Sequence, residues 1–89
     1  MISRAERRAA RTSRVAAVFD PGSVEAVLDL FETMEIAWHD LYGEITPPES
    51  VVDDALVVSG GNLAALIKAV RLGLADWRDL RVAADRTET

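Results

Sequence analysis

With 89 residues, the chain can form one domain with a thin hydrophobic core, to which a second copy could add. It contains no cysteine, which excludes disulfides and thiol chemistry and favours a cytoplasmic protein. No signal sequence is recognisable and no apolar run approaches the roughly 18 residues of a spanning helix, so we expect no membrane contact. The net charge of −5 divides unevenly: residues 1–14 carry +4, from five arginines and one glutamate, and the other 75 residues carry −9, from five cations and fourteen carboxylates.

The first segment, residues 1–19, is predicted to be a basic helix or arm, helical from Ser3 to about Val18. Its arginines fall on one helical face: Arg4, Arg7, Arg8 and Arg11, with Arg14 at the margin. We consider three interpretations of this arginine stripe: a solvated arm, docking on an acidic face within the chain or in a dimer, and binding to nucleic acid. Nucleic acid is less favoured, because the acidic body repels a polyanion and no aromatic residues alternate with the arginines.

The second segment is predicted to form a long helix from Pro21 to Tyr42, with Asp20 as its N-cap and Gly43 after its end. Apolar residues occupy an arc of about 160°, wider than a surface helix needs. They are Val24, Ala26, Val27, Leu30, Phe31, Met34, Ala37, Trp38, Leu41 and Tyr42. So wide an arc predicts contacts on both flanks of the helix.

The opposite arc of this helix is acidic. It carries Glu25, Asp29, Glu32, Glu35 and Asp40. Like charges three or four residues apart cost a few tenths of a kcal/mol per pair in an isolated helix, so a cation is expected to offset them. The arginine stripe is one such cation, because the short turn at Asp20 would return it past this helix. Leu28 and Ile36 interrupt the acidic arc, and with Leu72 they are predicted to lie outside the core as partner contacts.

A metal ion is the other cation that could offset these carboxylates. Glu32, Glu35 and His39 lie close together on the helical wheel, and carboxylate and imidazole groups are common metal ligands. A di-iron bundle needs Glu-x-x-His motifs on facing helices, however, and the chain has one histidine and no second motif. We therefore favour a solvated surface over a metal site and expect no cofactor.

Two further helices are predicted downstream. The sequence Thr46-Pro47-Pro48-Glu49 indicates a capping box for a helix from Pro47 to Val58, and Ser59-Gly60-Gly61 should end it with a left-handed glycine. Asn62 is then expected to cap a helix that extends to Ala83, with Trp77 as a core anchor. A strand at 56–58 before a phosphate-binding glycine turn is disfavoured, because the P-loop lysine and the three-glycine spacing are absent.

These elements predict an all-α protein: a small bundle of three core helices (within residues 20–84) plus a basic N-terminal helix or arm, with a frayed C-terminus at 85–89. The favoured function is a non-enzymatic interaction or regulatory module. It would self-associate as a homodimer, or bind another protein, through the wide apolar face and the complementary arginine and acidic stripes. The alternatives are a nucleic-acid-associated regulator that uses the arginine arm and a metal-dependent enzyme that uses Glu32, Glu35 and His39. An enzyme is the least favoured class, because no complete catalytic motif is present.

Overall fold

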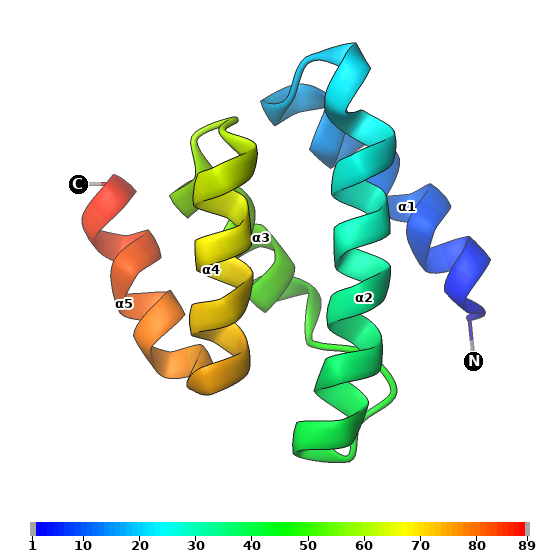
Figure 1. The fold of residues 1–89 in the computed structure, drawn as a ribbon, viewed down its shortest axis with the longest axis vertical. Helices are drawn as coiled ribbons and strands as arrows, with labels where there is room; N and C mark the ends of the chain where they lie inside the picture. The colour runs from blue at the N-terminus through cyan, green and yellow to red at the C-terminus, as the bar shows by residue number, and fades with distance from the viewer. Residues whose placement is uncertain (1, 89) are drawn as a thin grey trace.

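The computed structural model describes residues 2–88, and within them it contains helices and no strand, which confirms the all-α prediction. The elements are α1 (Arg4–Val18), the 3₁₀ helix η1 (Pro21–Ser23), α2 (Val24–Tyr42), α3 (Glu49–Ser59), α4 (Leu63–Ala75) and α5 (Trp77–Glu88). In Figure 1, α2 and α4 lie side by side at the front, α1 lies beside α2 on the right, and α5 lies at the opposite side of the molecule. No helix within residues 2–88 is both long enough and apolar enough to cross a bilayer.

The first helix follows the predicted span and begins with a capping box. The Ser3 hydroxyl accepts a hydrogen bond from the Glu6 amide at 3.1 Å, and the Glu6 carboxylate accepts one from the Ser3 amide at 3.2 Å. Val15 and Phe19, at the end of α1, are buried in the core. α1 packs mainly against α2. It is therefore a docked part of the fold.

The start of α2 differs from the prediction. Residues 21–23 form the 3₁₀ helix η1 with Pro21 at its first position, and the α-helix itself begins at Val24. The Asp20 side chain caps no backbone amide and instead accepts a hydrogen bond from the Ser23 hydroxyl at 3.0 Å. The end is as predicted, because Gly43 adopts a left-handed conformation with φ of +74°.

The predicted capping box at 46–49 is wrong. Helix α3 begins at Glu49, two residues later than expected, and no side chain caps it. Thr46 and Glu49 instead direct their side chains to arginines of α1. The predicted end is confirmed: Gly60 and Gly61 have φ of +55° and +83°, and the Asn62 side chain accepts from the Ala65 amide. Residues 56–58 are helical, so the strand alternative is wrong.

The predicted third core helix is in fact two helices. Asp76 has an extended backbone between α4 and α5, and its carboxylate accepts a hydrogen bond from the Arg78 amide at 3.0 Å. This contact serves one of the free amides at the start of α5. Gly73 allows the close approach of α5, because a Cβ atom there would lie 3.0 Å from Leu80. Residues 85–88, expected to be frayed, form the last turn of α5, and Thr89 lies outside the described residues.

The core draws on all five α-helices. Its buried apolar members are Val15, Phe19, Val27, Leu28, Phe31, Met34, Trp38, Val51, Val52, Ala55, Leu56, Leu66, Ala69, Val70, Leu80 and Ala84. Trp38 is buried as predicted, whereas Trp77 is 45% exposed and is not a core anchor. The break at Asp76 explains this difference, because Trp77 begins a new helix and no longer continues the apolar stripe of α4.

Candidate functional site

The arginines of α1 surround one buried carboxylate on α2. Glu35 is 1% exposed, and its two oxygens accept hydrogen bonds from Arg7 at 2.7 and 3.0 Å and from Arg11 at 2.8 Å. Arg4 lies 3.5 Å away at the edge of this cluster. The Thr46 hydroxyl adds a further hydrogen bond to Glu35 at 3.1 Å. A buried charge is tolerated when it is paired and fully hydrogen-bonded, and Glu35 meets both conditions.

The same contacts set the protonation of the cluster. Burial would by itself raise the pKa of Glu35, but hydrogen bonds from Arg7 and Arg11 outweigh it and hold the pKa below the ordinary value. Burial likewise opposes the shift at Glu49, where Arg11 and Arg14 lower the pKa of the carboxyl group. Both groups are therefore carboxylates at neutral pH.

The remaining arginines bind more exposed carboxylates. Arg8 donates to Glu25 and Asp29 at 2.7 Å each and lies 3.4 Å from Glu32. Arg11 and Arg14 reach beyond α2 to α3: Arg11 binds Glu49 at 2.7 Å, and Arg14 pairs with Glu49 and Asp53. Each predicted stripe arginine thus contacts a carboxylate of its own chain, which is docking within the monomer. Asp40 is separate from this network, and its carboxylate lies 3.7 Å from the imidazole of His39.

Three members of this network were not among the predicted site residues. Thr46, Glu49 and Asp53 bind the arginines from the α2–α3 connection and from α3. Glu49 and Asp53 are four residues apart and share a helical face, which is a signal that the sequence does contain. A second buried carboxylate, Asp54, accepts a hydrogen bond from Arg81 at 2.6 Å and links α3 to α5.

The metal candidates are not brought together as a site. Glu35 is enclosed by arginines, Glu32 is close to Arg8, and the His39 side chain is 64% exposed. Within residues 2–88, no group of three or more histidine, aspartate or glutamate side chains is placed to hold a metal ion.

The three apolar residues predicted to lie outside the core have different environments. Ile36 is 52% exposed, as predicted. Leu28 is 3% exposed, so this prediction is wrong: Leu28 lies on the flank of α2 that α1 covers. Leu72 is half-buried against the core, so it too was wrongly placed outside it.

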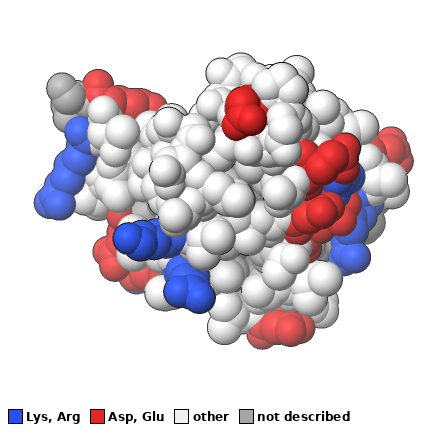
Figure 2. Space-filling model, turned by 45° about the horizontal axis from the view of Figure 1, so that its top comes forward, with Lys and Arg blue, Asp and Glu red and all other residues white. Residues whose placement is uncertain are grey.

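A different apolar surface is open between α2 and α4. The two helices are neighbours, and the uncovered flank of α2 carries residues from the predicted apolar arc. We define the α2–α4 face as Ala26, Leu30, Ala37 and Leu41 of α2 with Leu63, Ile67 and Leu74 of α4. Leu41 is 60% exposed, and Leu63 and Ile67 are 38% exposed each. Figure 2 shows a broad, mostly uncharged area in the middle of the view, with charged side chains mainly toward its margins.

The charged residues that border the α2–α4 face differ in sign between its two helices. On the exposed side of α2 lies Asp40, and on the exposed side of α4 lie Lys68 and Arg71. Lys68 and Arg71 form no ion pair with the residues from Ile2 to Glu88. The face is therefore an apolar strip between an acidic and a basic edge.

Comparison with known proteins gives no relative: no protein-family model, no curated protein and no solved structure matches this chain.

Proposed function

We propose that the protein is a small non-enzymatic interaction module that self-associates as a two-fold dimer through the α2–α4 face. The observation that supports this proposal most directly is the exposure of apolar side chains along two adjacent helices, Leu63 and Ile67 in the first half of α4 and Leu41 at the end of α2. An apolar face of this kind is stabilised when a partner removes it from water. The module would act in the cytoplasm, in keeping with the absence of cysteine.

The edge charges favour a second copy of the chain as the occupant. The Tyr42 hydroxyl, at the end of α2, donates to the Leu74 carbonyl at 3.1 Å, so the two helices end together. Figure 1 shows that they run in the same direction. A two-fold axis parallel to them would place α2 of one copy on α4 of the other. The basic edge, with Arg71, would then face the acidic edge, with Asp40, twice in the dimer.

Of the roles that the sequence allowed for the arginine stripe, this proposal uses docking within the chain and not pairing between two copies. Its five arginines already bind carboxylates of the same chain, so they hold α1 on one flank of α2 and leave the other flank for the partner. The same ion pairs argue against the nucleic-acid alternative, because that function needs these arginines to bind phosphates.

Sedimentation velocity over a wide concentration range tests the dimer. The unchanged chain should associate, and Ile67→Glu should be a monomer because it buries a charge in the apolar strip. Val82→Glu is the matched control, because Val82 is 48% exposed on α5, outside the α2–α4 face, and this variant should still associate. A monomer at every concentration for the unchanged chain would refute the proposal.

Charge reversal tests the pairing of the edges. Arg71→Glu should weaken association, because two acidic edges would then meet, and the double variant Arg71→Glu/Asp40→Arg should restore it. If the double variant associated no better than the single one, the axis would not be parallel to the helices. Circular dichroism of each variant would establish that the helices are intact.

A further inference from the structure

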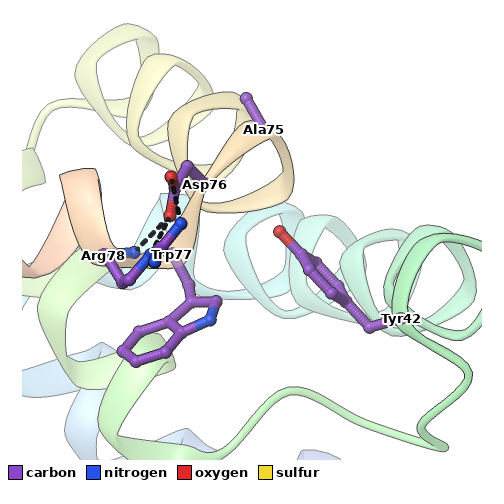
Figure 3. Close-up of a pocket in the computed structure, with 5 residues that line it drawn as sticks. All are labelled: Tyr42, Ala75, Asp76, Trp77 and Arg78. Carbon is purple, nitrogen blue, oxygen red and sulfur yellow. Dashed lines mark hydrogen bonds and ion pairs between the residues drawn. The ribbon is translucent and has the colours of Figure 1, made fainter.

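Trp77 and the aromatic residues near it form a groove. The groove lies at the end of the molecule where α4 ends, opposite the start of that helix. Trp77 begins α5, and Tyr42 ends α2 with 37% of its surface exposed. Trp38 packs on Tyr42 with their ring centroids 4.3 Å apart and the ring planes tilted by 38°. Figure 3 shows the rings of Tyr42 and Trp77 on opposite sides of an open space.

Two adjoining cavities share Trp77 as a wall. The smaller, about 220 Å³, is lined by Tyr42, Ala75, Asp76, Trp77 and Arg78. The larger, about 350 Å³, is lined by Trp38, Glu44, Pro48, Ser50, Val51 and Trp77. We call the larger one the Trp77 groove. Its size suits a single long side chain rather than a whole folded partner.

The charge in the Trp77 groove is negative and is not balanced locally. One oxygen of Glu44 accepts a hydrogen bond from the indole nitrogen of Trp38 at 3.0 Å, which fixes the carboxylate. No arginine or lysine within residues 2–88 pairs with Glu44. Arg78, which lines the smaller cavity, is bound to Asp76 through two hydrogen bonds of 3.1 Å. A cationic ligand would therefore find a free carboxylate oxygen.

We propose that the Trp77 groove binds an arginine side chain of a basic peptide. The guanidinium group would pair with Glu44, and the stem would lie between Trp77 and Pro48. Aromatic rings attract cations to their faces, and a planar guanidinium stacks on an indole better than an ammonium does. The groove thus supplies an aromatic wall, an apolar floor and one oriented carboxylate, which together match arginine.

This inference does not depend on the proposed dimer. The residues of the Trp77 groove come from the end of α2, the α2–α3 connection and the starts of α3 and α5. None of them belongs to the α2–α4 face. Peptide binding and self-association can therefore be tested separately, and either can fail without the other.

Tryptophan fluorescence provides the test, because both tryptophans of the chain line the groove. The probes are N-acetyl-arginine amide and N-acetyl-citrulline amide, which have nearly the same shape and differ in charge. The arginine probe should give a saturable change, and the citrulline probe should bind about tenfold more weakly, since it cannot form the ion pair or the cation–π contact. Equal binding of the two probes, or no saturable change with either, would overturn the proposal.

Variants locate the site. Glu44→Gln keeps an acceptor for the Trp38 indole and should reduce the preference for arginine over citrulline to what the cation–π contact alone provides, while Trp77→Ala should remove binding of both probes. Val82→Ala, on the same helix and outside the groove, is the control and should bind as the unchanged chain does. Unchanged selectivity in Glu44→Gln would place the cation elsewhere. An N-acetyl-lysine amide that bound as tightly as the arginine probe would contradict the assignment to arginine.

Discussion

The two flanks of α2 differ in how far the rest of the chain covers them. On one flank, α1 lies across Glu25, Asp29, Glu32 and Glu35, and the contact depends on ion pairs as well as on Val15 and Phe19. On the other flank, α4 covers only part of the apolar surface, and Leu41 is left 60% exposed. The sequence predicted a contact for both flanks, one from its acidic residues and one from its apolar residues. Only the acidic flank is matched by a helix of the same chain, α1.

This contrast shows how charge patterns and apolar patterns differ as evidence for a partner. Complementary charges that are close in sequence can meet within one chain through a short turn, as α1 and α2 do across residues 19–23. An apolar flank that remains exposed after the chain has folded is not covered by any segment of the same chain. The open α4 side of α2 is therefore the stronger evidence for an external contact.

Of the changes considered, acid should lower the stability of the fold most, through the charged flank of α2. The pKa values of Glu35 and Glu49 are lowered by folding from their ordinary value of 4.5, so their ion pairs stabilise the fold fully above that pH. The free energy of unfolding should fall as the pH decreases below about 4.5 toward the folded pKa values, because the unfolded chain takes up protons on these carboxylates more readily than the folded protein does. Urea midpoints measured between neutral pH and pH of about 3 test this, and a flat profile would contradict it.

Glu35→Gln should be the most destabilising single substitution on this flank. It leaves Arg7 and Arg11, at 7% and 2% exposure, without their central carboxylate. We expect a loss of about 3 kcal/mol in the free energy of unfolding, typical of breaking a buried pair. Asp40→Asn is the control on the same helix, outside the network, and should leave the urea midpoint of the monomer in place.

The next largest loss of stability is expected from substitutions at Gly61, which contacts the backbone at the end of α1. A Cβ atom on Gly61 would lie 2.7 Å from the Val18 carbonyl oxygen, and Gly61 has φ of +83°. Gly61→Ala should therefore cost about 2 kcal/mol, whereas Gly60→Ala, with φ of +55° and open space around it, should cost about 1 kcal/mol. Thermal unfolding of both variants compares them, and equal losses would show that α1 can shift to relieve the contact.

The open flank should give the smallest effect on stability. Leu41→Ser should change the free energy of unfolding of the monomer by no more than about 0.5 kcal/mol, because the side chain is already largely in water. The same substitution should weaken self-association, as measured by sedimentation. A large loss of monomer stability would mean that Leu41 is buried within its own chain.

Most of the helix pattern could be predicted because it depends on local signals. The glycines at 43 and 60 and the Asn62 cap mark helix ends wherever the rest of the chain lies. The break at Asp76 was also encoded locally, since aspartate is a favoured N-cap and Asp79 follows three residues later. The apolar stripe through Trp77 obscured it.

The errors in the site have a tertiary cause. Thr46 and Glu49 match a capping box by spacing, but arginines of α1 compete for both side chains and provide stronger, charge-assisted hydrogen bonds. Leu28 was placed on the surface because its neighbours on the wheel are acidic, but in the fold it is buried together with Glu35. Neither outcome can be read from the sequence of one helix, because each depends on which helix docks beside it.

The spacing of the arginines also limits changes in chain length. An α-helix turns by about 100° per residue, so one residue inserted between Thr12 and Ser13 would rotate the preceding arginines away from Glu35 while Val15 and Phe19 stayed in the core. An insertion in the connection at 43–45 would rotate no helix relative to its ion-pair partners. Insertion variants should therefore keep the fold when the added residue lies in that connection and lose stability when it lies within α1.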